Sequence, residues 1–541
     1  MAESHLKSLP EWAQLAVHAQ RMALPENHLK YLITQQHRLE NFSLREAGLF
    51  YDFSRQRIDS VVLKNLIDLA KNRNITQRFQ QMISGDLVNT SENRAALHTA
   101  TRSFLADPVM SNGMDVMPDI KRIRDEIRIF SDDFHSGKIA GADGKSFTDV
   151  VVIGIGGSYL ATEFAATALQ NSADKKIKLH FLSNVDIDNF GTIIDRIVPE
   201  TTLWIVISKS YTTAETLANT NMVYRFLSKN GLQAKDYIVT VTSKGSPGDD
   251  PANRVLKSFH MFDFIGGRYS VTSAVGAVPL SLYLGYARFE EFLKGAEEID
   301  IHANTAPAKK NIPLIAALIS VWNNNFLGYP AQGLIPYSFA LSKLAPHIQQ
   351  LNMESNGKSV SRHGEPLDIH CGSIIFGEPG TNAQHSFFQL AHQGRPFPIE
   401  FVGVVNPCHN EYTEKSKGVT NHQELWANLM AQPQALAEGK DDVDPAKYFS
   451  GNRPSSTLLI NDLSPKNIGR LLAFYEAKTV FEAFIWDINP FDQYGVELGK
   501  TMAGAIRNEI AKKNKNPDYQ FDNRDPVQKF YLDVLFNKKI T

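Results

Sequence analysis

Short apolar, β-branched runs alternate with longer mixed segments from about residue 150 onward. Each segment between two runs is long enough to form a helix. Strands that are buried on both faces of a parallel sheet have this near-continuous hydrophobic pattern. The alternation therefore predicts a parallel sheet with helices on both faces, whose strands are Val150–Gly154, Lys178–Ser183, Thr202–Ser208 and Tyr237–Thr242.

A second alternation of the same kind follows and predicts a second parallel sheet. Its strands are Gly333–Tyr337, Ser373–Gly377, Pro398–Val405 and Thr457–Asn461, and its helices are Lys309–Leu327, His422–Glu438 and Pro465–Phe484. The predicted fold class is α/β, with two doubly wound parallel-sheet α/β/α sandwich domains. Ligands of such sheets bind at the carboxyl ends of the strands, where the strand order reverses.

Helical segments are expected at both ends of the chain. Residues 1–104 are predicted to be mostly helical, and a last helix is predicted near Gly495–Lys512. Within the first segment, Ser91–Arg102 begins with a capping hydroxyl. Its two arginines and its histidine are interpreted as a solvated helix face.

The composition narrows the functional classes. The chain has 541 residues, and 56 Lys and Arg against 58 Asp and Glu give a net charge of −2, which provides no global argument for nucleic-acid or membrane binding. Its two cysteines, Cys371 and Cys408, have no metal-binding spacing. The N-terminal residues lack a signal-peptide pattern, and no uncharged apolar run is long enough to span a bilayer. We expect a cytoplasmic protein.

The glycine-rich loop Gly154–Ser158 directly follows the first predicted strand. Such a loop at the start of a helix forms a concave set of backbone N–H groups that favours a phosphate. A dinucleotide fingerprint requires a third glycine at position 159, where this chain has Tyr159. A nucleotide-dependent oxidoreductase, with Asp186 or Asp188 at the ribose, remains the less favoured alternative.

A second phosphate-type loop, Ser208–Thr213, follows the third predicted strand. Thr212 and Glu215 have capping-box spacing, which predicts that a helix starts here. Hydroxyl groups, an ammonium group and a helix dipole are what a phosphate dianion needs. Because both loops follow strands of one parallel sheet, we interpret them as the two sides of one phosphate pocket.

Four later segments carry candidate chemistry, although each alone also fits an ordinary surface. A glycine pair precedes Arg268 in Phe264–Ser270, and Glu354 is predicted to lie on a loop as a partly desolvated general base. His385 lies near the start of a predicted helix, where the dipole favours the neutral ring. Gln493 and Lys500 are polar candidates in Trp486–Lys500.

Taken together, these segments resemble the phosphoglucose isomerase family. The resemblance covers roughly Ser91 to Lys500 and rests most firmly on NMESNGKSV, GTNAQHSFFQLAHQG and FDQYGVELGK. It implies two sugar-isomerase-type (SIS) sandwich domains. The expected organisation is a helical segment at 1–104 that packs on the larger domain, a smaller phosphate-binding domain at 105–279, a larger domain with the base and the histidine at 280–500, and a helical extension at 501–541.

The resemblance also implies an enzyme, an aldose-ketose isomerase that interconverts glucose 6-phosphate and fructose 6-phosphate without a metal or cofactor. Its proton-transferring base falls on Glu354. Its ring-opening histidine falls on His385, assisted by Lys500, and its positive stabiliser of the intermediate falls on Arg268. Substrate contacts fall on Gly157, Ser158, Ser208, Lys209, Ser210, Thr213, Gly267, Gln350 and Gln493. The family's active site lies at a homodimer interface, which implies that the partner subunit contributes the histidine.

Some positions depart from the family's pattern. Ser158 is followed by Tyr159, Leu160, Ala161 and Thr162 instead of Asp-Leu-Gly-Pro, and Ser210 replaces a threonine. Leu351-Asn352 stands where Gly-Asp is common. A non-catalytic sugar-phosphate sensor on the same fold is a second alternative. The joint retention of the base, histidine, lysine and arginine argues against it, since a sensor needs only the phosphate pocket.

Overall fold

The computed structural model describes residues 6–173, 175–409, 411, 414–522 and 524–540. The chain divides into two compact units, Met1–Phe491 and Asp492–Thr541, each of which is described by itself. The finer boundaries predicted at residues 104, 279 and 500 stay predictions.

The first sheet is fully parallel, as its hydrophobic runs predict. Its strands, in spatial order, are β6 (Lys178–Leu182), β5 (Asp149–Ile153), β7 (Thr202–Ile207), β8 (Ile238–Ser243) and β9 (Lys257–Met261). All residues of β5 and β7 are buried, which explains their unbroken apolar sequences. The edge strand β9 was not predicted, because only its central Phe259 is buried and its other residues do not form an apolar run.

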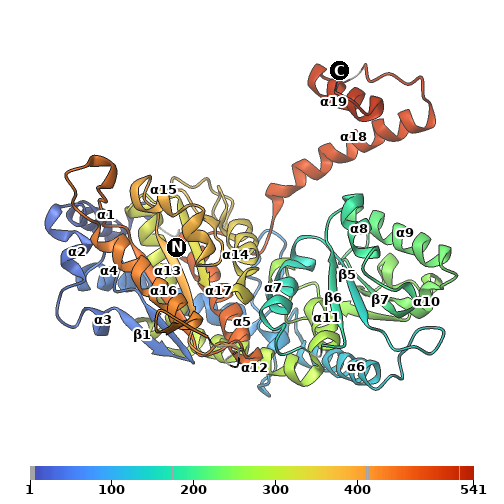
Figure 1. Ribbon diagram of the computed structural model, residues 1–541, viewed down its shortest axis with the longest axis horizontal. Helices are drawn as coiled ribbons and strands as arrows, with labels where there is room; N and C mark the ends of the chain where they lie inside the picture. The colour runs from blue at the N-terminus through green and yellow to red at the C-terminus, as the bar shows by residue number, and fades with distance from the viewer. Residues whose placement is uncertain (1–5, 174, 410, 412–413, 523, 541) are drawn as a thin grey trace. The chain divides into compact units, whose positions relative to one another are not determined.

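Helices cover both faces of this sheet (Figure 1). One face carries α7 (Leu160–Ala168) and α11 (Ala274–Leu284), with α6 (Met117–His135) packed on α11. The other carries α8 (Ile187–Ile194), α9 (Ala214–Lys229) and α10 (Ala234–Tyr237). These layers confirm the doubly wound prediction for this part of the chain.

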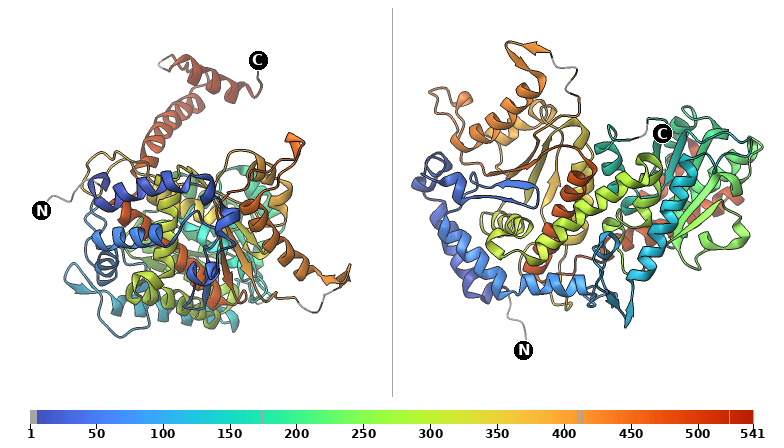
Figure 2. Two further views of the ribbon diagram at one scale, coloured as in Figure 1. Left: turned by 90° about the vertical axis from the view of Figure 1, so that its left-hand side faces the viewer. Right: turned by 90° about the horizontal axis from the view of Figure 1, so that it is seen from below.

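The second sheet has six strands, of which four are parallel. Its spatial order is β1 (Ser43–Glu46), β2 (Leu49–Asp52), β15 (Ser455–Ile460), β12 (Ile399–Val404), β10 (Ala331–Tyr337) and β11 (Ile374–Phe376). The four predicted strands β10, β11, β12 and β15 are present and parallel. The hairpin β1–β2 pairs antiparallel with β15, and the right-hand view of Figure 2 shows it in blue along the sheet. The prediction of a mostly helical N-terminal segment missed this hairpin.

Side chains of β12 show how the second sheet is covered on both faces. Phe401 packs in a cluster with Leu429 and Leu436 of α16 (Asn421–Glu438). Glu400, on the opposite face, accepts hydrogen bonds from side chains of α17 (Pro465–Trp486). Nearly all of α17 is buried, and it packs against α12 (Tyr286–Thr305) and α13 (Ile312–Val321).

The remaining α-helices described in this unit are α1 (Pro10–Met22), α2 (Leu29–Leu32), α3 (Arg38–Asn41), α4 (Ser60–Asn72), α5 (Ile75–Ser84), α14 (Leu344–Ile348) and α15 (Phe388–Gln393). Two short hairpins join β3 (Met110–Ser111) to β4 (Met114–Asp115) and β13 (Lys415–Ser416) to β14 (Val419–Thr420).

The prediction of an exposed helix at Ser91–Arg102 is wrong. Only Ala100–Arg102 is helical, as the 3-10 turn η3. Arg102 is fully buried and forms ion pairs with Asp300 of α12, at 2.6 Å, and with Glu476 of α17. These contacts come from residues about 200 and 370 positions away, so the local sequence could not indicate them.

The described residues of the second unit form the 3-10 turn η15 (Tyr494–Val496) and two α-helices, α18 (Glu497–Lys515) and α19 (Pro526–Asn537). Phe521, between the helices, packs against Phe536 of α19, and the Tyr519 hydroxyl donates to Glu509 of α18 at 2.6 Å. The predicted C-terminal helix is thus confirmed. Across the ranges that the structure describes, no helix combines the length and the apolar character needed to cross a membrane.

Candidate active site

The glycine loop after β5 forms the 3-10 turn η4 (Gly156–Ser158), which leads into α7. Gly156 has φ +58°, a left-handed conformation that glycine adopts without strain. A Cβ atom on Gly157 would lie 2.2 Å from the carbonyl carbon of Gly267. Only glycine therefore lets this loop pack directly against the turn η8 (Gly267–Tyr269), which carries Arg268.

The second predicted loop follows β7, the direct neighbour of β5. Since β6 lies on the other side of β5, the strand order reverses between β5 and β7. The Gly154–Ser158 and Ser208–Thr213 loops thus leave the sheet at the position where ligands of doubly wound folds bind. This arrangement supports the interpretation of a shared anion pocket.

The hydroxyl groups of the second loop do not cap α9. The helix begins at Ala214, its N-cap residue Thr213 makes no side-chain cap bond, and the predicted capping box is wrong. Instead, the Thr212 and Ser210 hydroxyls lie 2.7 Å apart, and the Tyr211 N–H donates to Ser208 Oγ at 3.1 Å. Because the Thr213 side chain does not accept from the first-turn N–H groups of α9, these groups can donate to a bound anion.

Lys209 provides the positive charge of this loop. Its Nζ donates to the backbone carbonyl of Asp263 at 3.0 Å and lies 3.6 Å from the Asp263 carboxylate. Burial lowers the pKa of Lys209, and the Asp263 carboxylate opposes this shift. The contact ties the loop after β7 to the segment that leads to Arg268.

Glu354 lies on a helical turn, so its predicted loop placement is wrong. The π-helical turn η12 (Gln349–Glu354) continues α14, and the helical conformation extends through Ser355 and Asn356. The Glu354 side chain is 23% exposed. Its Oε2 accepts a hydrogen bond from Gln350 Nε2 at 3.1 Å and lies 3.5 Å from Arg268 Nη1. A partly exposed carboxylate held in this way can accept a proton.

The Arg268 guanidinium is fixed by contacts on several sides. Its side chain is 1% exposed, its Nε donates to Ser355 Oγ at 2.6 Å, and its Nη2 donates to the Pro490 carbonyl. The Tyr269 hydroxyl lies 3.0 Å from the same Ser355 Oγ. Such a fixed cation can stabilise negative charge without reorganising.

The structure therefore brings five of the predicted site residues together. Gly157 packs on Gly267, Arg268 follows Gly267 and faces Glu354, and Gln350 bonds Glu354. A Cβ on Gly156 would lie 3.2 Å from Gln350 Nε2, so the glycine loop also adjoins the turn with the base. A site that places a carboxylate, a guanidinium and an anion loop side by side can abstract a proton from a bound phosphorylated molecule.

Three further predicted residues, His385, Gln493 and Lys500, belong to other elements. His385 ends the 3-10 turn η13 (Asn382–His385) and is exposed, and among the described residues it makes no hydrogen bond or ion pair. Gln493 and Lys500 belong to the second unit, where Lys500 Nζ donates to Glu497 at 2.8 Å and is 61% exposed. Their roles stay predictions.

The sequence did not identify Ser355, Asn352 and Asn356 as part of the site. A run of small polar residues indicated a turn, yet Ser355 Oγ accepts from Arg268, and both asparagines bond Glu482 of α17. The only available signal was the spacing of the asparagines. Residues four apart share one face of a helix.

The features proposed for a nucleotide have other uses. The Asp186 carboxylate caps α8 by accepting from the Asp188 N–H at 3.0 Å. Tyr159, at the position of the missing glycine, is the N-cap residue of α7. Neither observation supports the oxidoreductase alternative.

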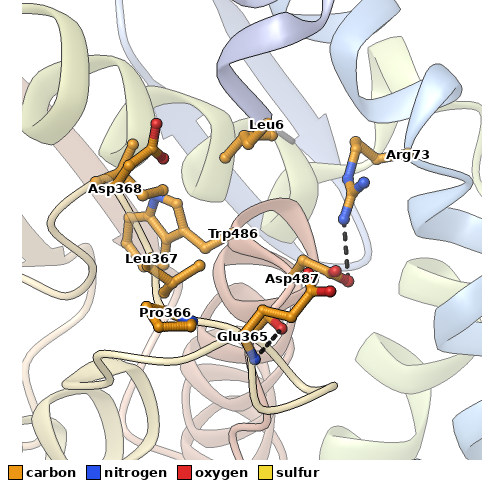
Figure 3. A pocket seen from close by; sticks show the side chains of 10 residues that line it. Leu6, Arg73, Glu365, Pro366, Leu367, Asp368, Trp486 and Asp487 are labelled. Carbon is orange, nitrogen blue, oxygen red and sulfur yellow. Dashed lines mark hydrogen bonds and ion pairs between the residues drawn. The ribbon is translucent and has the colours of Figure 1, made fainter. Parts of the chain in front are cut away.

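A separate cavity of about 40 Å³ lies among Leu6, Arg73, Trp486 and Asp487 (Figure 3). Asp487 is the C-cap residue of α17 and forms ion pairs with Arg73, Arg78 and Arg362 at 3.0–3.1 Å. Cations at the C-terminus of a buried helix stabilise its dipole, so this cluster has a structural explanation. None of the predicted site residues lines this cavity.

Within the described ranges, no group of three His, Cys, Asp or Glu side chains is suited to a metal ion.

Comparisons with known proteins converge on one family. The family model described as "Phosphoglucose isomerase" matches residues 52–524. The chain is 60% identical to the glucose-6-phosphate isomerase of Desulfosudis oleivorans over 99% of both chains, and 43% identical to the cytosolic glucose-6-phosphate isomerase of Arabidopsis thaliana over 92% of both. The crystal structure of a glucose-6-phosphate isomerase from Chlamydia trachomatis superposes with a TM-score of 0.89 at 36% identity, covering 99% of this chain and 100% of the other.

Proposed function

The chain belongs to the phosphoglucose isomerase family, and on that premise we propose that it interconverts glucose 6-phosphate and fructose 6-phosphate. The observation that carries the proposal is the position of Glu354. It is a partly exposed carboxylate, 3.5 Å from a buried guanidinium and on a turn that adjoins the glycine loop. This combination fits an aldose-ketose isomerase better than a sensor, because binding a phosphate does not require a base.

The phosphate group would be held between the two loops at the switch point of the first sheet. The backbone N–H of Gly157 and the hydroxyl of Ser158 would supply donors from one side. On the other side the donors would be the side chains of Ser208, Lys209, Ser210 and Thr213. Binding energy from this remote group fixes the sugar carbons relative to the base, which turns an intermolecular proton transfer into an effectively intramolecular one.

Ring opening precedes the isomerisation. His385, assisted by Lys500, would transfer the proton between the ring oxygen and the anomeric hydroxyl. His385 is exposed in the structure and is not joined to Glu354, which suits a residue that completes the site of a second subunit. We therefore propose a homodimer in which each active site takes its histidine from the partner, and a location in the cytoplasm.

Glu354 would then remove the proton from C2 of the open sugar. The resulting cis-enediol carries developing negative charge on its oxygens, while the carboxylate becomes neutral. Arg268 lies 3.5 Å from Glu354, so its charge remains next to the negative charge as that charge moves to the substrate. Return of the proton to C1 gives the ketose. Gln350 holds the Glu354 carboxylate in position, and Gln493 would be a further substrate contact.

The test is isomerisation in deuterated water, with the label followed at C2. Turnover together with solvent label at C2 supports the enediol mechanism. Replacing Glu354 by Gln keeps the shape but removes the base, so kcat should fall about 10²–10⁴-fold in a folded protein. Near-wild-type turnover of Glu354→Gln would contradict the assignment. Binding of the sugar phosphate with neither exchange nor turnover in the wild type would favour the sensor.

A further inference from the structure

Two asparagines flank the proposed base and donate to the same buried carboxylate. Asn352 Nδ2 lies 2.6 Å, and Asn356 Nδ2 2.8 Å, from Oε2 of Glu482 on α17. Glu482 is 1% exposed, and Asn352 and Asn356 are 5% and 0% exposed. A buried carboxylate is costly unless it accepts hydrogen bonds, and both of these donors come from the turn that carries Glu354.

The geometry of the turn connects this contact to the base. Residues 352 and 356 share one helical face, and position 354, midway between them, projects from the opposite face. The exposures agree, because Glu354 is 23% exposed while both asparagines are buried. Glu482 therefore holds the buried side of the turn. On the other side, Arg268 and Gln350 contact the Glu354 carboxylate.

Glu482 lies on α17, whose buried polar side chains also contact β12. The neighbouring Glu400 is held by the Tyr475 hydroxyl at 2.6 Å and by Lys478 Nζ at 3.3 Å. Asn356 Nδ2 also approaches the Thr479 carbonyl of α17 at 3.3 Å. Since α17 is buried along nearly its whole length, it offers a rigid support for the turn.

We propose that Glu482 is a positioning residue, which fixes the turn of Glu354 through its two hydrogen bonds to Asn352 and Asn356. The inference rests on the proposed isomerase function. In this chain, an aspartate at position 352 would place a second carboxylate against Glu482. In this chain the donor at 352 and the acceptor at 482 form a matched pair.

The experiment exchanges donor and acceptor. Glu482→Leu and Asn352→Asp each break the pair, and kcat should fall about 10–100-fold, the effect of a small displacement of a catalytic group. KM should change by less than about threefold, because the phosphate loops are unaffected. In the double variant Asn352→Asp/Glu482→Gln, the glutamine Nε2 replaces Oε2, and its two hydrogens donate to the new aspartate and, after a flip of the Asn356 amide, to Asn356 Oδ1. This variant should recover most of the lost kcat.

Glu400→Gln is the matched control, because it alters a buried glutamate on the same layer without touching the turn. Its kcat should stay within about threefold of the wild type. The proposal is overturned if Asn352→Asp keeps wild-type kcat, if the double variant is no faster than Asn352→Asp, or if Glu400→Gln loses as much kcat. Should Glu482→Leu fail to fold, the comparison of Asn352→Asp with the double variant still decides. A wild-type chain without isomerase activity would refute the proposed function itself, whereas an active wild type with unaffected variants would refute only this inference.

Discussion

Arg268 and Glu354 face each other with opposite accessibilities. The guanidinium is 1% exposed and bonded to Ser355 and Pro490, whereas the carboxylate is 23% exposed. The cation is therefore fixed by the protein, and the base is the member of the pair that substrate can reach. Fixed charge beside a reachable base is the arrangement that electrostatic stabilisation of a transition state requires.

Replacing Arg268 by Lys tests the need for this fixed geometry. A lysine keeps the charge but has a single nitrogen, which cannot reach Glu354, Ser355 and Pro490 together. We expect kcat to fall about 10²-fold, and the loss of hydrogen bonds to reduce the free energy of unfolding by about 1–3 kcal/mol. Steady-state kinetics and denaturant unfolding measure both. Arg395→Lys, at an exposed position, is the control, and equal kcat values for the two variants would contradict the role of Arg268.

At the residue scale, the sequence predicted which groups take part better than how they are held. Glycine spacing and the family resemblance pointed to Gly157, Arg268 and Glu354, and the structure brings these residues together. The contacts that fix them join distant positions, such as Arg268 and Ser355, 87 residues apart. Burial of a polar residue such as Arg102 depends on partners of this kind, so its local sequence suggested a solvated helix.

At the scale of elements, the site depends on the close packing of η4 on η8. Their backbones meet at Gly157 and Gly267, where a Cβ on Gly157 would overlap the Gly267 carbonyl. The packing transmits the position of the phosphate loop to Arg268, and through it to the turn of Glu354. The loop proposed to bind the phosphate and the turn that carries Arg268 are thus joined by direct backbone contact.

Gly157→Ala should separate these two turns. The added methyl group would lie 2.2 Å from the Gly267 carbonyl carbon, so the loops must shift apart. We expect kcat/KM to fall about 10–100-fold, with a loss of about 1–3 kcal/mol in stability. The control is Gly191→Ala in α8, where no atom lies within 4 Å of the added Cβ, and where alanine should add about 0.5–1 kcal/mol. Unchanged kcat/KM in Gly157→Ala would show that the two turns adapt freely.

The buried ion cluster that joins η3, α12 and α17 should make stability depend on pH. Burial raises the pKa of Glu476 to about 7, and the Arg102 guanidinium opposes this shift. The folded chain thus keeps a proton that the unfolded chain loses above its ordinary pKa of 4.5. The associated stability is complete below pH 4.5 and is lost as pH rises to about 7, a change of about 3 kcal/mol.

Glu476→Gln should remove this part of the pH dependence. Melting temperatures measured from pH 5 to pH 8 should fall less in the variant than in the wild type, because glutamine does not titrate. The exposed Glu424→Gln should retain the wild-type slope. Parallel curves for wild type and Glu476→Gln would show that this carboxyl group does not bind the proton.

The strands that were predicted well from the sequence are those with continuous hydrophobic patterns. The strands β5, β7, β10 and β12 are buried and apolar, and their positions agree to within two residues. The strands β1, β2 and β9 were missed because each is short or only partly buried, and β2 owes its place to β15. The π-helical turn of Glu354 was missed for a related reason, since its asparagines bond to α17 rather than locally.

At the scale of the whole molecule, the proposed site requires residues that one unit does not bring together. Glu354 and Arg268 lie in the first unit, Lys500 lies in the second, and His385 is exposed and unconnected to the base. A homodimer that exchanges histidines accounts for the position of His385. It also makes each active site depend on two copies of the chain.

Mixing two inactive variants tests this dependence. A heterodimer of Glu354→Gln with His385→Ala has one site with both mutations and one site with neither, if the histidine comes from the partner. Random exchange of subunits then restores about a quarter of the wild-type activity. Activity is measured after denaturing and refolding the variants together, with separately refolded variants as controls. No recovery in verified heterodimers would place base and histidine in the same subunit.

The N-terminal hairpin has a consequence for the chain during its synthesis. β2 pairs with β15, and the Tyr51 hydroxyl donates to Ser456, a residue 405 positions later. A ribosome that adds about 5–20 residues per second takes about 20–80 s to make that partner. Throughout this interval the hairpin presents an unpaired strand edge, which other nascent chains can pair with. The edge of β2 that β15 covers in the finished sheet is therefore open to wrong pairing for most of the chain's synthesis.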